Sequence, residues 1–317
     1  MPNTPRFEPI TDWEKDVPPR GMISGLAFDS DDKLYACTRK KGDVEAAVFV
    51  YAPSGKFLRS WGEGLFVQPH GITVTPDGYV YVVEDYGSAV RKFTLDGVHV
   101  ETVGPSGEEN RSDTGADLTI KSLYDRLQTI RRDGAGPFNH PTSLAVAPNG
   151  DRYIADGYGN CKVHCFSPAG ELKRSWGRAG AGPGEFHLVH AVLVASDSKV
   201  YVCDRENDRI QIFSPEGAFL GEWADVQRPN SVACDKEGNF YIGESIIRPG
   251  HRTFVCGLAV ATMPPNITIK DSDGSSIGEF GRGMTLTHSM ALDSQGNVFV
   301  AGEPIADGIG LIKHVRI

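Results

Sequence analysis

Three of the nine histidines in this 317-residue chain stand in similar short stretches of sequence. They are His70 in "VQPHGITV", His190 in "HLVHAVLV" and His288 in "TLTHSMAL". Three imidazoles can hold a transition metal and leave coordination positions open for water or substrate, as catalytic zinc sites require. A single histidine beside a strand is usually satisfied by ordinary hydrogen bonds, so the metal hypothesis depends on a fold that brings all three together.

The three stretches belong to a repeat: an alternating apolar run, a turn rich in Gly, Asp or Asn, and a second alternating run. This pattern is typical of a β-hairpin. A weaker first copy and five clear ones align: "SGLAFDSDDKLYACTR", "HGITVTPDGYVYVVED", "TSLAVAPNGDRYIAD", "HAVLVASDSKVYVCD", "NSVACDKEGNFYIGE" and "HSMALDSQGNVFVAGE". Most copies are followed by a third strand such as "AVRKFTL", then by a glycine and a fourth strand such as "GELKRSWG".

Six units of four strands predict an all-β fold, a six-bladed β-propeller. The last unit ends "GLIKHVRI" without a fourth strand, and the N-terminal segment "RFEPITDW" is expected to supply it and close the ring. Such a propeller is one domain over residues 1–317. Insertions are expected at about 105–137, with a short helical pattern in "IKSLYDRLQTIRR", and at about 247–275, where they could form a lid or an oligomer contact.

The residue at the start of each first strand, which we call the slot position, is polar in every blade. In blade order the slot residues are Ser24, His70, Thr142, His190, Asn230 and His288. Because blades of a six-fold ring lie about 60° apart, histidines in alternate blades lie about 120° apart around the central channel. The other six histidines do not share this register, and ordinary structural roles are expected for them: His99, His140, His164, His187, His251 and His314.

The ends of the second strands lie at the same edge of each antiparallel hairpin as the slot position. They carry Thr38-Arg39-Lys40, Glu84-Asp85-Tyr86, Asp156-Gly157-Tyr158, Asp204-Arg205-Glu206, Glu244-Ser245 and Gly302-Glu303. Arg39 and Arg205 could bind a substrate carboxylate in fork geometry. Tyr158 and Tyr86 could act as acid or base, if a nearby arginine or metal lowers the phenol pKa.

The acids at these strand ends have a simpler interpretation. Carboxylates in such positions commonly cap turns and accept hydrogen bonds from backbone amides. That structural role is expected for Glu84, Asp156, Asp204 and Glu244.

Composition limits the classes of partner. The net charge is −9 with no basic block, which argues against nucleic acid or an anionic membrane surface. No segment is long enough to span a bilayer, and the N-terminus lacks an apolar run of signal-peptide type. The six cysteines form no CxxC pair and are expected to be buried reduced thiols of a cytoplasmic protein. The oligomeric state stays open.

At these residues the sequence resembles a known family. The repeats resemble NHL repeats, and "FNHPTSLAVAPNGDRYIADGYGNCKVHCFSPAGELKRSWG" with "VYVCDRENDRIQIF" resembles the catalytic core of peptidyl-α-hydroxyglycine α-amidating lyases. The resemblance implies a six-bladed propeller with a catalytic zinc on His70, His190 and His288. It also implies that Tyr158 is the catalytic tyrosine and that Arg205 and Arg39 are the active-site arginines.

The chain also departs from that family. Ser289 stands where the family has an aspartate that binds a structural calcium, which argues against Ca²⁺ here. Tyr201 and Ile212 replace disulfide cysteines around "DRENDRIQ". We also expect no attached monooxygenase domain to generate the usual peptide substrate. The metal centre could therefore be kept while the substrate differs.

The leading hypothesis is a metal-dependent lyase that cleaves the C–N bond of a carbinolamide or a related α-hydroxy acid derivative. The metal, zinc first and iron, cobalt or manganese as alternatives, would polarise the substrate hydroxyl on the three histidines. Tyr158, with its pKa lowered by Arg39 and the metal, would remove the hydroxyl proton, and Arg205 with Arg39 would hold the carboxylate of a small-molecule substrate.

Two other classes of function stay open. One is a metal-dependent hydrolase or hydratase acting on a small polar metabolite. The calcium-dependent lactonase propellers are a weaker variant, because three histidines suit their carboxylate-rich site poorly. The other is a non-catalytic NHL propeller that binds a protein partner.

Overall fold

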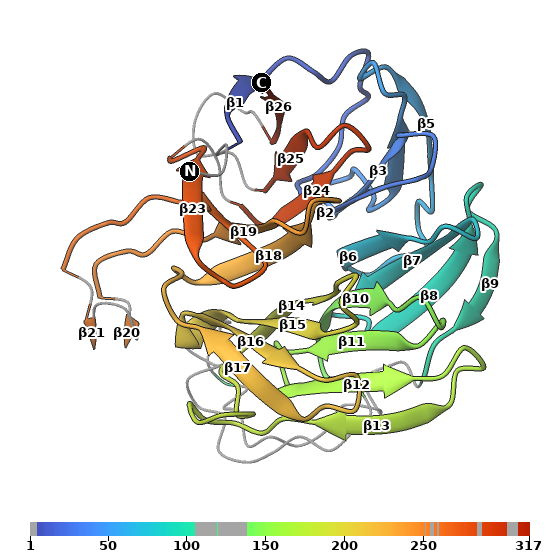
Figure 1. Ribbon diagram of the computed structural model, residues 1–317. Coiled ribbons are helices and arrows are strands. Elements are labelled where there is room, and N and C mark those ends of the chain that lie inside the picture. The colour runs from blue at the N-terminus through green and yellow to red at the C-terminus, as the bar shows by residue number, and fades with distance from the viewer. Residues whose placement is uncertain are drawn as a thin grey trace.

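The computed structural model describes residues 5–104, 119, 138–250, 252–253, 257–258, 260–283, 287–302 and 310–317. Within these ranges the chain forms six four-stranded antiparallel sheets arranged around a common centre (Figure 1). The first strands of all six sheets line a central cavity of about 310 Å³. The predicted all-β, six-bladed propeller is therefore confirmed.

The first three blades follow the chain in simple order, from the innermost strand outward. Blade one contains β2 (Ile23–Phe28), β3 (Leu34–Thr38), β4 (Val48–Tyr51) and β5 (Phe57–Trp61). Blade two contains β6 (Pro69–Val74), β7 (Tyr79–Glu84), β8 (Ala89–Thr94) and β9 (His99–Thr102). Blade three contains β10 (Pro141–Val146), β11 (Arg152–Asp156), β12 (Lys162–Phe166) and β13 (Leu172–Trp176).

The last three blades each add a variation. Blade four contains β14 (Val189–Val194), β15 (Val200–Asp204), β16 (Arg209–Phe213) and β17 (Phe219–Trp223), with a short 3₁₀ turn, η2 (Arg205–Asn207), after β15. Blade five contains β18 (Pro229–Cys234), β19 (Phe240–Glu244), β22 (Asn266–Lys270) and β23 (Ser276–Phe280). Blade six contains β24 (Ser289–Leu292), β25 (Val298–Ala301), β26 (Leu311–Arg316) and β1 (Phe7–Ile10).

The N-terminal strand β1 closes the ring, as the sequence predicts. It pairs antiparallel with β26, from Phe7 opposite Arg316 to Ile10 opposite Lys313, and the two strands lie side by side in Figure 1. The Phe7 ring stacks on Phe280 of blade five with centroids 4.2 Å apart. The two ends of the chain are thus joined in one blade, which leaves no open edge between blades six and one.

Tryptophans near the ends of the outermost strands form joints between neighbouring blades. Against each indole lies a glycine in the outer turn of the next blade, with positive φ and no room for a Cβ. The pairs are Trp13 with Gly55, Trp61 with Gly97, Trp176 with Gly217 and Trp223 with Gly274. Trp13 belongs to the closing segment, so the joint between blades six and one repeats the other three.

The expected insertions require one correction. The range 247–275 includes β22, the third strand of blade five, so the inserted residues end before Asn266. Within the insertion, β20 (Arg252–Thr253) and β21 (Gly257–Leu258) pair as a small hairpin that projects away from the ring (Figure 1). The other insertion, 105–137 with its expected helix, lies outside the described residues apart from Thr119.

Helices contribute little to the described part of the chain. None of those found there is long and apolar enough to cross a membrane.

Candidate metal centre

The slot residues are set apart from the rest of their strands by a local irregularity. In blades one to five the pairing of the first two strands skips the slot residue, as between Pro69 and Gly71 or between Val189 and Ala191. His288 directly precedes β24. A bulge of this kind re-aims the side chain of the extra residue, here toward the channel. The residue after the slot must be small: a Cβ on Gly71 would lie 2.6 Å from the Thr142 carbonyl oxygen of blade three.

Each slot histidine is braced by the slot residue of the next blade. His70 Nδ1 donates to the backbone carbonyl of Thr142 at 2.7 Å, and His190 Nδ1 donates to that of Asn230 at 2.6 Å. His288 Nδ1 closes the series by donating to the carbonyl of Ser24 at 2.9 Å. A carbonyl can only accept, so all three rings carry their proton on Nδ1 and present an Nε2 lone pair to the channel.

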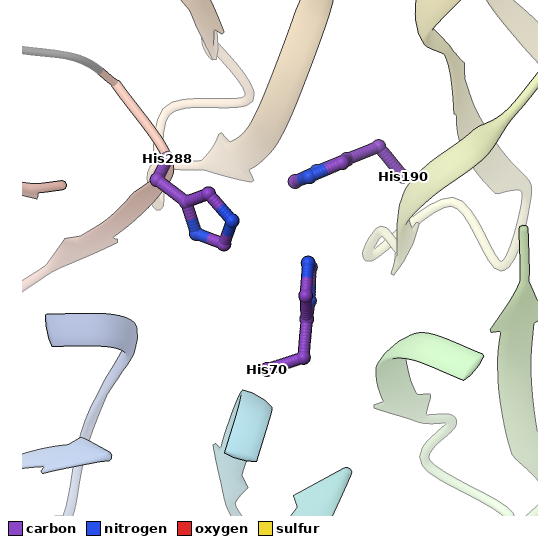
Figure 2. Close-up of side chains that lie close together, drawn as sticks. All are labelled: His70, His190 and His288. Atoms are coloured by element: carbon purple, nitrogen blue, oxygen red, sulfur yellow. The ribbon is translucent and has the colours of Figure 1, made fainter. Parts of the chain in front are cut away.

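The three imidazoles converge on one point, as Figure 2 shows. Their ring centroids lie 4.7–5.1 Å apart, and one ligand nitrogen from each lies within 4.8 Å of the other two. His70 and His190 are buried, whereas His288 is partly open to the channel. The predicted triangle of His70, His190 and His288 is therefore present in the structure.

All three imidazoles are held in the neutral form that metals bind. Burial lowers the pKa of His70 and His190 well below the usual value, and the neighbouring imidazoles and arginines add to the effect. Burial, followed by the charge of Arg39, lowers the pKa of His288 to about 3. Deprotonation therefore costs nothing at neutral pH when a metal binds.

Tyr158 lies against two of the histidines. Its hydroxyl is 3.1 Å from His70 Nε2 and 3.0 Å from His190 Nε2. One hydroxyl proton cannot satisfy two acceptors, and His288 adds a third lone pair to the cluster. A cation supplies the positive charge that this cluster lacks, so the donor set fits a transition-metal ion. Gly157 allows the approach, because a Cβ there would overlap the Val189 backbone of blade four.

Arg205 contacts the same Tyr158 hydroxyl, and its charge helps to lower the pKa of His190 and His288. Its Nη1 donates to the Tyr158 hydroxyl at 3.5 Å, and its Nε donates to Glu206 Oε1 at 2.8 Å. Arg228 donates to the same Glu206 oxygen at 2.7 Å. Burial alone would raise the pKa of Glu206, but the charges and hydrogen bonds of the two arginines lower it to about 2. Glu206 is therefore an anion that fixes the direction of Arg205.

Arg39 reaches the centre from blade one and is less firmly held. Its Nη2 lies 3.8 Å from Asp85 Oδ2, and its buried Nε has no hydrogen-bond partner among the described residues. The charge of Arg39 lowers the pKa of both His70 and His288, which places it near the cluster. The arginine that contacts the Tyr158 hydroxyl is Arg205. The expected effect of Arg39 on Tyr158 stays a prediction.

The strand-end acids have the structural role that the sequence predicts. Each accepts a hydrogen bond from the backbone amide three residues before the slot of its own blade. The pairs are Glu84 with Val67, Asp156 with Asn139, Asp204 with His187 and Glu244 with Gln227. These carboxylates fix the turn that delivers the slot residue and do not point at the metal site.

Three further residues can be placed. Tyr86 is 43% exposed and packs edge-on against His140, so the structure does not place it with the slot histidines. His164 lies between Asp156 Oδ2 at 3.1 Å and Ser175 Oγ at 2.6 Å. Gln211 makes the equivalent contact to Asp204 in blade four, so this Asp–His–Ser arrangement belongs to the blade scaffold.

The positions of Ser289, the cysteines and Glu303 can also be compared with the expectations from the sequence. Ser289, which replaces the calcium aspartate, accepts a hydrogen bond from the Leu26 amide at 3.0 Å. The described cysteines, Cys37, Cys161, Cys165, Cys203 and Cys234, form no disulfide in the described part of the chain, and all but Cys234 are buried. Glu303, one of the strand-end residues, lies outside the described part of the chain.

Sequence reasoning missed Arg228 altogether. It lies two residues before the slot of blade five, a position where the other blades carry unlike residues. The repeat therefore offers no signal for it. Glu206 was named with its strand end, but nothing in the pattern indicated that it joins two arginines.

Comparison with known proteins agrees with this geometry. The NHL repeat family matches residues 138–166, which cover blade three as far as β12. Human NHL repeat-containing protein 3 is 28% identical over 216 residues, which is 64% of this chain and 56% of that protein. A probable peptidyl-α-hydroxyglycine α-amidating lyase of Caenorhabditis elegans is 27% identical over 303 residues, which is 89% of this chain and 79% of that protein.

A solved structure shows the same fold. A gluconolactonase from Xanthomonas campestris superposes with a TM-score of 0.64 over 99% of this chain and 95% of that one, at 14% identity. That identity supports the fold and carries no argument about activity. Taken with the sequence matches, the chain is a six-bladed β-propeller with an NHL repeat, similar at modest identity to peptidyl-α-hydroxyglycine α-amidating lyases and to NHL repeat-containing protein 3.

Proposed function

We propose that the protein is a metal-dependent lyase that cleaves the C–N bond of a carbinolamide bearing a carboxylate. One observation carries the proposal: three neutral, braced imidazoles present their Nε2 atoms to one point, with the Tyr158 hydroxyl 3.0–3.1 Å from two of them. The likeness to the Caenorhabditis elegans lyase supports the same chemistry. We propose zinc as the ion, since His₃ sites with open positions are typical of catalytic zinc.

His70, His190 and His288 would hold the ion through Nε2. When bound, the ion supplies a Lewis acid that polarises the substrate hydroxyl. The protein residues orient the ligands, move the proton and bind the carboxylate. Nδ1 hydrogen bonds to the next blade keep the rings oriented, as the outer partners of metal-bound histidines generally do.

Tyr158 is the proposed general base. Tyr158 would act as the phenolate: its oxygen accepts the proton of the substrate hydroxyl, with Arg205 Nη1 3.5 Å away to stabilise the negative charge. As the proton leaves, the substrate C–O bond becomes the carbonyl of an aldehyde and the C–N bond breaks. The nitrogen takes that proton back from Tyr158 and leaves as an amide. For an N-acyl-α-hydroxyglycine the products are the acyl amide and glyoxylate.

Arg205 and Arg39 are the proposed carboxylate ligands. Arg205 is held by Glu206, while Arg39 has a buried Nε without a partner in the described region and only a long ion pair at 3.8 Å. A substrate carboxylate would supply the missing acceptor in fork geometry. The expected substrate is therefore a small molecule with a carboxylate beside the hydroxylated carbon, and neither nucleic acid nor membrane is expected as a partner.

The test joins metal analysis to product analysis. Protein purified without chelators should contain about one equivalent of zinc, iron, cobalt or manganese, and should release glyoxylate from N-benzoyl-α-hydroxyglycine. Protein without a stoichiometric metal, or metal-loaded protein that releases no glyoxylate from any of several α-hydroxyglycine amides, would overturn the proposal.

Replacing Tyr158 with Phe separates chemistry from metal binding. Tyr158→Phe removes the base but none of the Nε2 ligands, so metal content should be unchanged while kcat falls by about 10²–10⁴-fold. Tyr86→Phe is the matched control, because Tyr86 also follows a second strand but is 43% exposed beside His140. A Tyr158→Phe variant with full kcat would remove the tyrosine from the mechanism.

A second candidate is a binding protein without catalysis. The similarity to NHL repeat-containing protein 3 favours it. It predicts that alanine at each slot histidine leaves metal content unchanged. For location, the free thiols of the described cysteines support a reducing compartment, and we propose the cytoplasm.

A further inference from the structure

Five of the six slot side chains hydrogen-bond to the backbone of the next blade, and one does not. Besides the three histidines, Ser24 Oγ donates to the Pro69 carbonyl at 2.8 Å and Thr142 Oγ1 donates to the Val189 carbonyl at 2.9 Å. Asn230 breaks the pattern. Its Oδ1 is buried and has no hydrogen-bond partner among the described residues.

Asn230 is placed at the metal layer. It is only 5% exposed, and it lines the central cavity together with the three slot histidines. Its backbone carbonyl braces His190, so the residue is fixed between the blades of His190 and His288. Tyr158 contacts His70 and His190 and therefore occupies a different sector of the ring.

In the described part of the chain, Ser231, the residue after Asn230, likewise lacks a hydrogen bond that its serine counterparts in other blades make. Ser143 Oγ accepts the Val192 amide, and Ser289 Oγ accepts the Leu26 amide, both from the next blade. Ser231, at the same position in blade five, has a buried Oγ without a partner in the described region. Among the described residues, blade five thus leaves polar atoms unsatisfied at both positions, whereas the slot residues of the other blades and Ser143 and Ser289 are satisfied.

Buried polar atoms without partners are costly, and they persist in native proteins chiefly where a ligand or water completes them. A carboxamide offers an acceptor and a donor about 2.3 Å apart on one carbon. A carbinolamide offers the complementary pair on one carbon, an N–H donor and a hydroxyl oxygen. The two groups can therefore form two parallel hydrogen bonds.

We infer that the Asn230 carboxamide recognises the carbinolamide carbon of the substrate through both of these hydrogen bonds. Oδ1 accepts the substrate N–H, and Nδ2 donates to the substrate hydroxyl oxygen, while Tyr158 takes the hydroxyl proton. The inference rests on the proposed function and adds a specificity residue to it. It explains why the slot of blade five carries a group that the fold leaves unbonded.

The test uses two pairs of probes that the enzyme cannot cleave by this route. Mandelate and phenylacetate differ by the hydroxyl, and N-benzoylglycine and 3-benzoylpropionate differ by N–H against CH₂. Affinities are measured by calorimetry on metal-loaded protein. Wild type should prefer the first member of each pair by roughly tenfold, the size of one well-made hydrogen bond. Asn230→Leu should lose the N–H preference, weaken the hydroxyl preference, which the metal also supports, and keep the affinity for phenylacetate and 3-benzoylpropionate.

Thr142→Val is the matched control at the slot of blade three. It removes a hydroxyl that bonds to Val189, so it should lower the melting temperature and keep both preferences. Asn230→Leu removes an unpaired polar group, so the melting temperature of the metal-free protein should stay the same or rise. Asn230→Ala serves as a second variant in case the leucine does not fit, and it should lose the N–H preference too.

The outcomes separate this inference from the proposed function. Asn230 variants that keep the full N–H preference, or wild type that shows none, overturn the role of Asn230 even when glyoxylate release is normal. Absence of glyoxylate release by the wild type overturns the proposed lyase whatever the binding results. A fall in melting temperature for Asn230→Leu equal to that of Thr142→Val would assign Asn230 to the scaffold.

Discussion

Blades two, four and six bring histidine to the slot position, whereas blades one, three and five bring serine, threonine and asparagine. Both sets sit on equivalent strands and point into one channel. Their tasks differ. The histidines offer Nε2 to the centre, and the other blades offer the backbone carbonyls that hold Nδ1, as from Thr142 to His70.

The difference shows why the ligands alternate. The ring centroids of the three imidazoles are already 4.7–5.1 Å apart, the usual separation of packed rings, so a fourth ring has no space in the same layer. Each ligand also needs a neighbour that supplies a carbonyl and a small or compact side chain. Alternation around a six-fold ring therefore provides one supporting backbone carbonyl for each histidine.

The largest expected effect comes from removing the ligands. Alanine at His70, His190 or His288 should reduce bound metal to well below one equivalent and lower glyoxylate release by about 10³-fold or more, because the Lewis acid is lost. Metal analysis of each purified variant checks this. His99→Ala is the control, since His99 is exposed on β9 and should change neither quantity. Variants that keep one equivalent of metal would show that the slot histidines are not its ligands.

Acid should act in part through the histidine slots. The pKa of His288 is about 3 in the folded protein, against 6.5 for histidine in an unfolded chain. The unfolded chain therefore binds more protons at intermediate pH. Stability of the metal-free protein therefore falls as pH drops from 6.5 toward 3. His288→Gln removes this loss, so its stability relative to wild type should rise by up to about 3 kcal/mol between neutral pH and pH 4.5.

Denaturant melts of wild type and His288→Gln across that pH range measure the difference. The other titrating groups are shared by the two proteins, and those that are not coupled to His288, unlike His70 and His190, cancel. A difference independent of pH would contradict the neutral, buried state of His288. Ser24→Ala, from a slot that does not titrate, should show the pH-independent behaviour.

Residues outside the slot ring should affect substrate and not metal. Glu206→Gln removes the charge that orients Arg205, so KM should rise about tenfold with metal content unchanged and kcat less affected. The folded-state pKa of about 2 also implies a stability loss of about 3 kcal/mol at neutral pH. Steady-state kinetics with N-benzoyl-α-hydroxyglycine would separate KM from kcat. A fall in kcat alone would place Glu206 in the chemical step instead.

The smallest expected effect comes from substitutions at the slot positions without histidine, those of blades one, three and five. Ser24→Ala removes one hydrogen bond to the Pro69 carbonyl and should cost about 1 kcal/mol of unfolding free energy. Metal content and kcat should be unchanged, because the Ser24 carbonyl still braces His288. Chemical denaturation provides the free energy. Loss of metal in this variant would mean that the serine hydroxyl, and not the backbone, maintains the centre.

Much of the fold and the candidate metal site could be predicted from the sequence. The period-two pattern of the hairpins is local, so it identifies strands and turns without any knowledge of contacts. The slot register follows from aligning those hairpins, which is why His70, His190 and His288 could be recognised together. The missing fourth strand after "GLIKHVRI" likewise indicated closure by the N-terminal segment.

The surroundings of the site could not be predicted in the same way. Arg205, and not Arg39, contacts the Tyr158 hydroxyl, and Arg228 reaches Glu206 from the next blade. Neither contact repeats from blade to blade, so aligning the units does not reveal it. The unbonded carboxamide of Asn230 was also invisible, since the sequence shows only that the slot is polar.

The sequence by itself determined the number of blades, the closure of the ring and the identity of the three converging imidazoles, because each depends on patterns repeated among near neighbours. Only the tertiary structure decided which nitrogen of each histidine faces the channel, which arginine meets the tyrosine and which slot is left unbonded. These depend on contacts between blades, such as the hydrogen bond from His288 to Ser24, which joins residues 264 positions apart. Packing of the whole ring fixes such distances, and no local pattern encodes them.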